Sequence, residues 1–460
     1  MVYPPVPHRL IKGNIWPALP SAKGQTMLSL LYQMDQIQWW SPDDIRAHQF
    51  QQLKALISHA SEKVPFYQAR INDCGLKPPF DYLAERWSEL PVLTRHNIQS
   101  EGSALHSKKL PKFHGAISDI HTSGSTGAPI RALRTELALS FWSAITLREH
   151  LWHRRDFRGK LAVIRDSTPG QSMYPKGSRY QFWGSSRRTF DTGPCVALNI
   201  NSSAAEQAEW LVRENPDYLL SHPTNILRVA NYCIENKIQV PNLKQINTLS
   251  EILRPEVRDA CMAAWNTPVT DNYSSREIGY MALQCPEHPH YHVQAEGVYL
   301  EVVDDLGKPC NPGQIGRILV TPLHNFAMPL IRYDVGDYAE MGAPCPCGRG
   351  LPTLNRIMGR EQNMLTKADG EKVWTLLSEG KIRELLQIAA IQEYQFIQKS
   401  RTEIEARFIV AQPLTPHETQ QIKGWLSDKF GSEFEFDLIF PKQLQRSSSG
   451  KLQDFISEII

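Results

Sequence analysis

Residues 122–129 read Thr-Ser-Gly-Ser-Thr-Gly-Ala-Pro, which places four hydroxyl side chains and two glycines within eight positions. Glycine lets the backbone bend back and bring its N–H groups close to an anion, while Ser and Thr add donors with little bulk. The preceding segment Phe113–Ile120 is expected to end in a short strand, and Leu133–Trp152 is rich in helix formers. This context favours a phosphate-binding loop over a flexible surface loop.

The loop lacks the Gly-Lys-Ser/Thr ending of the P-loop in common NTPases. It resembles instead the phosphate-binding loop of the adenylate-forming superfamily of acyl-CoA synthetases, peptide-synthetase adenylation domains and luciferases, and most of all its phenylacetate-CoA ligase-like branch. The resemblance covers nearly the whole chain, because four further motifs follow in the family's order. They are Asn272–Glu277 (Asn-Tyr-Ser-Ser-Arg-Glu), Arg332–Asp337 (Arg-Tyr-Asp-Val-Gly-Asp), Gly359–Arg360, and Arg446–Lys451 (Arg-Ser-Ser-Ser-Gly-Lys).

The length and charge of the chain bound its class. At 460 residues the chain exceeds the length that one hydrophobic core usually serves, so at least two domains are expected. The resemblance implies an adenylation domain over residues 1–360, which binds ATP and the acid, and a mobile C-terminal domain over residues 361–460. A formal charge of +2 argues against a dedicated nucleic-acid binder. The absence of a long apolar run and of a secretion pattern predicts a cytoplasmic protein that does not associate with membranes.

The apolar pattern predicts an α/β fold. Four short apolar runs alternate with helix-compatible stretches between residues 161 and 249, as in a parallel sheet covered by helices. The region Tyr291–Tyr338 predicts a small β-barrel-like, mostly antiparallel unit, in which Met328–Tyr333 is expected to be a strand. Residues after 360 predict a small α+β module. Helical spacing favours a helix over Asp43–Glu62, whereas the Pro-rich opening thirty-odd residues are expected to wrap over the surface.

The resemblance implies an ATP-dependent, AMP-forming carboxylate ligase. Such an enzyme activates a carboxylic acid, here expected to be aromatic, as an acyl-adenylate and passes the acyl group to coenzyme A. Two other readings stay open: an amide synthetase that uses an amine acceptor in secondary-metabolite or cell-surface polysaccharide synthesis, and a catalytically degenerate protein that only binds nucleotide or ligand. A homodimer is common among similar enzymes.

The motifs assign roles to individual residues through the resemblance. Lys451, Glu277 and Arg276 are expected to be catalytic, with Glu277 also binding Mg²⁺ and Arg276 contacting the α-phosphate. Asp337 is expected to accept hydrogen bonds from both ribose hydroxyls, and Tyr273 to flank the adenine. The full set of expected nucleotide-binding residues is Thr122, Ser123, Gly124, Ser125, Thr126, Gly127, Ser250, Glu251, Asn272, Tyr273, Ser274, Asp337 and Arg360.

A second cluster of residues suggests a metal. Residues 285–292 read Cys-Pro-Glu-His-Pro-His-Tyr-His, and Cys345-Pro-Cys347 follows about sixty residues later. Thiolate and imidazole side chains are the ligands of structural zinc sites. We therefore expect Cys285, His292, Cys345 and Cys347 to bind a structural Zn²⁺, with His288 and His290 as alternative histidine ligands. The other reading is a set of reduced, buried cysteines beside a polar turn.

Overall fold

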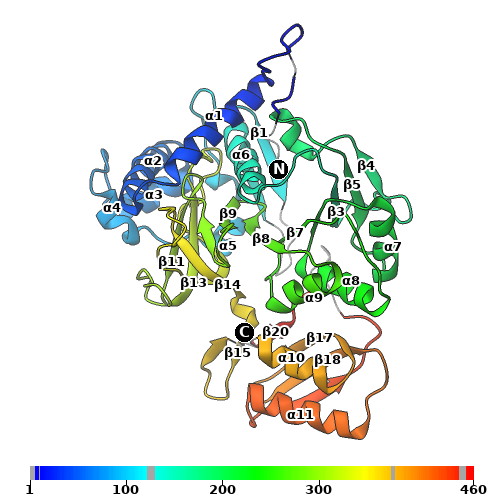
Figure 1. Ribbon diagram of the computed structural model, residues 1–460. Coiled ribbons are helices and arrows are strands. Elements are labelled where there is room, and N and C mark those ends of the chain that lie inside the picture. Colours follow the sequence, from blue (N-terminus) through cyan, green and yellow to red (C-terminus); the bar gives the residue numbers. More distant parts are fainter. Residues whose placement is uncertain (1–5, 10, 122–129, 375–378, 445–451, 460) are drawn as a thin grey trace. The chain divides into compact units, whose positions relative to one another are not determined.

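The computed structural model describes residues 6–9, 11–121, 130–374, 379–444 and 452–459 (Figure 1). The chain divides into two compact units, which are described in turn. The first comprises Met1–Gly159, Tyr180–Cys195 and Asp271–Ile357, and the second comprises Lys160–Arg179, Val196–Thr270 and Met358–Ile460. None of the described helices is long and apolar enough to cross a lipid bilayer.

Helices open the first unit. The predicted helix over Asp43–Glu62 is confirmed as α2 (Pro42–Lys63), which begins where the Ser41 hydroxyl accepts the Asp44 N–H. The Pro-rich opening, which was expected to wrap over the surface, contains a helix that the sequence did not predict, α1 (Ala22–Ile37), which lies beside α6 (Glu136–Trp152) (Figure 1). The remaining helices of this part are α3 (Pro65–Asp73), α4 (Leu83–Arg86) and α5 (Arg95–Glu101).

The first unit also contains a long antiparallel sheet and a hairpin. The hairpin joins β1 (Ile117–His121) to β2 (Arg131–Thr135), so that Leu133–Thr135 are strand rather than the start of the following helix. The sheet strands are hydrogen bonded in the order β11, β12, β13, β14, β10, β9, β8. Their bounds are β8 (Val269–Ser275), β9 (Gly279–Gln284), β10 (Tyr291–Val293), β11 (Val298–Val303), β12 (Ile315–Pro322), β13 (Tyr333–Met341) and β14 (Thr353–Arg360).

The predicted strand over Met328–Tyr333 is wrong. These residues, apart from the first residue of β13, follow an irregular path, and Arg332 has a positive φ of 50°. The side chains of Met328, Leu330 and Ile331 are nonetheless buried in the main core of this unit. A continuous apolar run indicates burial on all sides, and burial alone does not distinguish a strand from a packed loop.

The second unit begins with the predicted parallel sheet. Strand β6 (Tyr218–Ser221) lies between β3 (Leu161–Arg165) and β7 (Gln245–Leu249), and both pairings are parallel. Helix α7 (Ala204–Glu214) begins with a reciprocal capping box between Ser203 and Glu206. The other elements are β4 (Ser178–Tyr180), β5 (Cys195–Asn199), α8 (Pro223–Glu235) and α9 (Pro255–Trp265). The carboxyl ends of β6 and β7 therefore open on the same edge.

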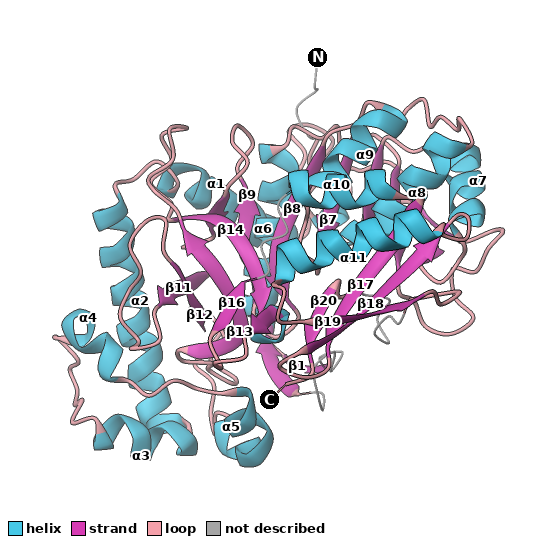
Figure 2. Ribbon diagram, turned by 90° about the horizontal axis from the view of Figure 1, so that it is seen from below, coloured by secondary structure: helices cyan, strands magenta, loops and turns pink. Residues whose placement is uncertain are grey.

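The predicted α+β module after residue 360 is also present in the second unit. Its sheet has the order β19, β18, β17, β20, and Figure 2 shows α10 and α11 lying together along this sheet. Apolar side chains of both helices pack on Phe396 and Phe408. The bounds are β15 (Met364–Thr366), β16 (Lys372–Trp374), α10 (Glu379–Ile388), β17 (Ile391–Gln398), β18 (Glu403–Val410), α11 (Pro416–Phe430), β19 (Glu435–Ile439) and β20 (Phe455–Ser457).

Candidate active site and metal centre

The hairpin of the first unit leads into the hydroxyl-rich loop. Strands β1 and β2 stay paired up to His121 opposite Arg131, while Thr122, Ser123, Gly124, Ser125, Thr126 and Gly127 lie outside the described residues. The Arg131 guanidinium contacts the Asp119 carboxylate at 2.6 Å. Arg276 comes from a different part of the unit and donates through Nη1 to the His121 carbonyl at 3.3 Å. The Asn272–Glu277 motif thus lies against the strand that enters the loop.

Two predicted nucleotide-binding residues meet directly. Tyr273 near the end of β8 donates its phenol hydrogen to Oδ2 of Asp337 in β13, at 2.8 Å. Both side chains are half-buried. A carboxylate only accepts hydrogen bonds, and each of its two oxygens can accept more than one. This hydrogen bond therefore connects the Asn272–Glu277 motif to the Arg332–Asp337 motif.

The neighbours of this pair differ in exposure. Asn272 is buried, Ser274 and Glu277 are half-buried, and Arg276 is exposed. Among the described residues, no side chain or backbone group is hydrogen bonded or ion-paired to the Glu277 carboxylate. A partly buried carboxylate without a protein partner is suited to a cation ligand.

The first residue of the third motif is held in the core. Arg332 forms an ion pair with Glu301 at 3.1 Å, with side chains only 4% and 9% exposed. Its Nη1 also donates to the carbonyls of Ser88 and Leu90, at 2.8 and 2.6 Å. Trp87 donates to the same Glu301 carboxylate at 2.8 Å. This buried network fixes the chain that leads into β13 and so supports Asp337.

Neutralising Glu301 should destabilise the protein. In Glu301→Gln the Arg332 guanidinium stays buried without its counter-charge, which costs about 3 kcal/mol of unfolding free energy. Urea unfolding followed by tryptophan fluorescence measures the loss. The matched control is Glu89→Gln, which breaks the exposed Arg86–Glu89 pair and should leave the unfolding midpoint unchanged. Equal midpoints for the two variants would contradict this role of the network.

The second unit carries the other predicted nucleotide-binding residues. Ser250, just beyond β7, has a positive φ of 74°, an uncommon conformation for a residue with a side chain. The neighbouring Glu251 accepts the Thr224 N–H at 3.0 Å through one oxygen and the Leu452 N–H at 3.1 Å through the other. Lys451 lies outside the described residues, and Leu452 is the residue that follows it.

Gly359 and Arg360 end β14 in this unit. Gly359 has a φ of 97°, and a Cβ at this position would stand 2.8 Å from Cδ1 of Ile252. Only glycine fits both the conformation and the close approach. The Arg360 N–H donates to Oδ1 of Asn363 at 2.9 Å, and Asn363 donates to the Phe455 carbonyl at 2.7 Å. The motif before residue 361 is therefore tied to β20.

The four predicted metal ligands come together in the first unit. One ligand atom each from Cys285, His292, Cys345 and Cys347 lies within 4.8 Å of all the others. The Cys285 and Cys345 sulfurs are 3.9 Å apart, and Nε2 of His292 is 3.4 Å from the Cys347 sulfur. Zinc–sulfur bonds of about 2.3 Å in a tetrahedron require sulfurs about 3.8 Å apart. His288 and His290 stack on each other and are not part of this group.

Burial sets the protonation of these ligands. It lowers the pKa of His292 to about 4, so the imidazole is neutral and able to coordinate a cation at neutral pH. Burial also raises the pKa of Cys345 to about 12, so this thiol stays protonated unless a cation compensates the thiolate charge. The donor set, the spacing and the burial all fit a structural zinc ion.

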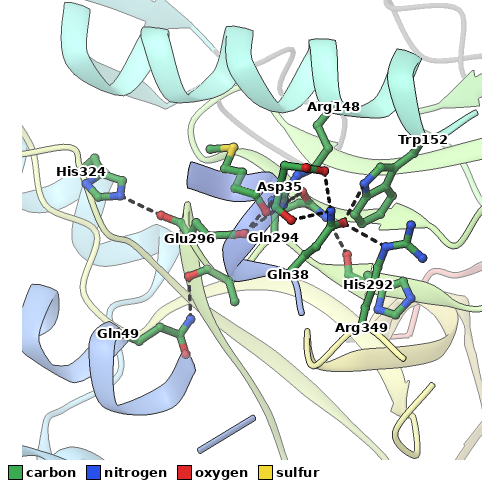
Figure 3. Close-up of polar contacts among 12 residues, drawn as sticks. Asp35, Gln38, Gln49, Arg148, Trp152, His292, Gln294, Glu296, His324 and Arg349 are labelled. Carbon is green, nitrogen blue, oxygen red and sulfur yellow. Dashed lines mark hydrogen bonds and ion pairs between the residues drawn. The ribbon is translucent and has the colours of Figure 1, made fainter. Parts of the chain in front are cut away.

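A buried polar network supports the His292 strand (Figure 3). Gln294 donates to the His292 carbonyl at 3.1 Å and accepts from Arg148, which also pairs with Glu296 at 2.7 Å. Arg349, two residues after Cys347, donates to the Gln38 side chain at 3.0 Å (Figure 3). These contacts connect the segments that carry His292 and Cys347 to α6 and to Gln38, the residue that follows α1.

Comparison with known proteins gives relatives along most of the chain, although no protein-family model matches the sequence. The chain is 22% identical to the phenylacetate-coenzyme A ligase of Pseudomonas putida, over 78% of this chain and 80% of that protein. It is 21% identical to the same-named ligase of Thermus thermophilus, over 89% and 96%. A crystal structure of 2-hydroxyisobutyryl-CoA ligase in the postadenylation state, with R3-HIB-AMP, superposes with a TM-score of 0.70 at 19% identity and covers 92% of each chain. The predicted α/β fold class is confirmed.

Several functional groups escaped the sequence analysis. Glu301 and Trp87 lie far from the third motif in sequence, and no local pattern connects them to Arg332. Asp454 pairs with Arg254 and stands three residues after Lys451, outside the Arg446–Lys451 motif. The signal in the sequence for a charged contact here was an acidic residue three positions after Lys451. Its partner is 200 residues away along the chain.

Proposed function

We propose that this protein is an AMP-forming acid–CoA ligase of the phenylacetate-CoA ligase-like branch of the adenylate-forming superfamily, which its similarity to two phenylacetate-coenzyme A ligases and to 2-hydroxyisobutyryl-CoA ligase supports. In the first half-reaction, a carboxylate oxygen of the acid attacks the α-phosphorus of ATP. The bond from that phosphorus to the bridging oxygen breaks, and pyrophosphate leaves. In the second, the sulfur of coenzyme A attacks the acyl carbon, and AMP leaves with the electron pair of the broken bond.

This proposal is supported above all by contacts in the first unit between the Asn272–Glu277 motif and two others, the strand that leads into the hydroxyl-rich loop and the Arg332–Asp337 motif. Arg276 reaches the strand that leads into the hydroxyl-rich loop, and Tyr273 in the same motif contacts Asp337. A nucleotide binding along these contacts would meet loop donors at its phosphates and the Asp337 carboxylate at its ribose. Positioning and charge neutralisation of this kind account for most of the catalysis of phosphoryl-type transfers.

The roles that the resemblance implies for individual residues are consistent with the chemistry of each group. The loop Thr122–Gly127 donates to the β- and γ-phosphates, and Arg276 contacts the α-phosphate. Glu277 holds Mg²⁺, which neutralises phosphate oxygens when bound. Lys451 brings an ammonium group to the acid and the α-phosphate. Asn272, Ser274, Ser250, Glu251 and Arg360 line or support the nucleotide.

Replacing Asp337 tests the ribose contact. Asp337→Ala removes two charge-assisted hydrogen bonds, and we expect kcat/KM for ATP to fall by about 100-fold. The measurement is initial-rate pyrophosphate release at varied ATP. The matched control is Tyr273→Phe, which removes only the hydroxyl that contacts Asp337 and should leave kcat/KM within about threefold of the parent value. Unchanged kinetics in Asp337→Ala would remove the ribose assignment.

The acid is proposed to be aromatic, as the names of both relatives suggest. The first structural neighbour is named for a small aliphatic acid, so the test must include both classes. The pocket is proposed near the carboxyl ends of β6 and β7, where His222 is buried and its ring contacts the Leu249 carbonyl at 3.2 Å. Pyrophosphate release across aryl and alkyl acids should be highest with an aryl acid. A preference for alkyl acids would reject this substrate class.

The acceptor is tested on the same reaction. Mass spectrometry of products formed with coenzyme A should show an acyl thioester. An amide formed with an added amine, and no thioester, would favour the amide-synthetase alternative. Binding of ATP without acid-dependent pyrophosphate release would instead favour the degenerate binding protein.

We propose a structural Zn²⁺ at Cys285, His292, Cys345 and Cys347. The four donor atoms supply a complete tetrahedral set, which leaves no open position for substrate. The ion would cross-link the chain after β9, strand β10 and the connection between β13 and β14. Its role is therefore to stabilise the first unit rather than to take part in the reaction.

A further inference from the structure

The chain immediately after Lys451 is held by residues 251–256 of the same unit. Arg254 forms an ion pair with Asp454, and the Leu452 N–H donates to Glu251 at 3.1 Å. Tyr394 in the neighbouring strand β17 donates to Glu256 at 3.2 Å. Three side chains within six residues thus engage the C-terminal module, two of them at the positions one and three residues beyond the lysine.

The residues that make these contacts are themselves held in place by their surroundings. Glu251 is anchored because its other oxygen accepts the Thr224 N–H in the first turn of α8, where helix N–H groups favour negative charge. Arg254 is the residue before Pro255 at the start of α9, so its backbone conformation is restricted. On the other side, β20 pairs with β17 from Phe455 onward.

The ion pair is largely removed from water. The side chains of Arg254 and Asp454 are 23% and 19% exposed. Burial alone would lower the pKa of Arg254, but the Asp454 carboxylate outweighs it and the pKa is raised. Charged hydrogen bonds in such surroundings are stronger than those on an open surface.

We propose that Arg254 and Asp454, together with Glu251, are positioning residues that hold residues 452–454, which directly follow Lys451, for the adenylation half-reaction. This inference rests on the proposed function, because it assigns Lys451 to that step. None of the three residues contacts the reacting atoms in this role. Their contacts fix residues 452–454, and thereby limit where the ammonium of the preceding lysine can go.

The kinetic test compares the two half-reactions in Asp454→Asn and Arg254→Gln. Acid-dependent pyrophosphate release should fall by roughly tenfold in each variant, as for loss of one charged hydrogen bond. Thioester formation from preformed acyl-adenylate and coenzyme A should change by less than about twofold. The double variant should be no slower than either single variant, because both remove the same contact. Equal losses in the two half-reactions, or additive losses in the double variant, would overturn the proposal.

A structural readout separates this proposal from the proposed function. Amide hydrogen exchange of the peptide spanning residues 452–459 should speed up in Asp454→Asn. It should not change in the matched control Glu458→Gln, which breaks the exposed Lys399–Glu458 pair of the same segment. The same peptide should exchange more slowly in Arg254→Lys, which keeps the charge, than in Arg254→Gln. Faster exchange in a protein that releases no pyrophosphate would reject the enzyme but keep the contact, whereas unchanged exchange in Asp454→Asn would reject the contact.

Discussion

Lys451→Ala is expected to lower acid-dependent pyrophosphate release by about 1,000-fold, at the upper end of the effect of losing a group that stabilises transition-state charge. In the adenylation step, negative charge shifts onto the leaving pyrophosphate while the carboxylate oxygen approaches the α-phosphate. A compact ammonium on a long stem can neutralise the carboxylate oxygen and an α-phosphate oxygen at once. Loss of the charge should reduce kcat far more than it changes KM for ATP.

The matched control for this variant is Lys442→Ala. Lys442 is an exposed lysine of the same C-terminal segment, nine residues before Lys451. It should leave both half-reactions unchanged. Thioester formation from preformed acyl-adenylate should also survive in Lys451→Ala, because that step does not involve the pyrophosphate bond. A loss shared by the two lysine variants would point to a general charge effect rather than to catalysis.

Removal of the proposed zinc ion should have the largest effect on stability. The purified protein is expected to contain one zinc per chain, and Cys347→Ser or exhaustive chelation should lower the unfolding free energy by about 5 kcal/mol. The physical reason is that two buried sulfurs, the half-buried sulfur of Cys347 and a buried imidazole lose the charge that holds them together. Elemental analysis and the thermal midpoint measure the two effects.

The control for the metal is Cys74→Ser. Cys74 is half-buried, outside the cluster, with its sulfur 3.3 Å from the Glu89 carbonyl. It should keep the zinc content and most of the stability. The zinc site would be contradicted if protein purified from zinc-replete cells contained no zinc and the two serine variants had equal midpoints. Three reduced cysteines and a histidine without a metal would then be the correct description.

Local sequence patterns were enough to predict the repeating parts of the fold. Strands β3, β6 and β7 and the helices between them follow from apolar runs bounded by polar turns. The same reasoning failed at residues 328–332, where burial without regular structure produced a strand-like pattern. It also failed for α1, because the prolines before Ser21 obscured a helix that buries only Gly24, Met27 and Met34.

The candidate site was predictable only where its residues lie within short motifs. The motifs Asn272–Glu277 and Arg332–Asp337 predicted candidate nucleotide residues, of which Tyr273 and Asp337 meet in the structure. The spacing of Cys and His residues predicted the four side chains that cluster as a candidate metal site. The groups that hold these residues come from distant parts of the chain. Arg332 needs Glu301 and carbonyls near residue 90, and Asp454 needs Arg254. Such partners depend on how the chain folds back on itself, which no local spacing records.

We propose that this chain adenylates a carboxylic acid. The most direct measurement is exchange of labelled pyrophosphate into ATP, with Mg²⁺, a panel of acids and no coenzyme A. We expect exchange that requires the acid, is highest with the preferred acid, and is lost in Lys451→Ala. Absence of exchange with every acid, from folded protein that binds ATP, would contradict it.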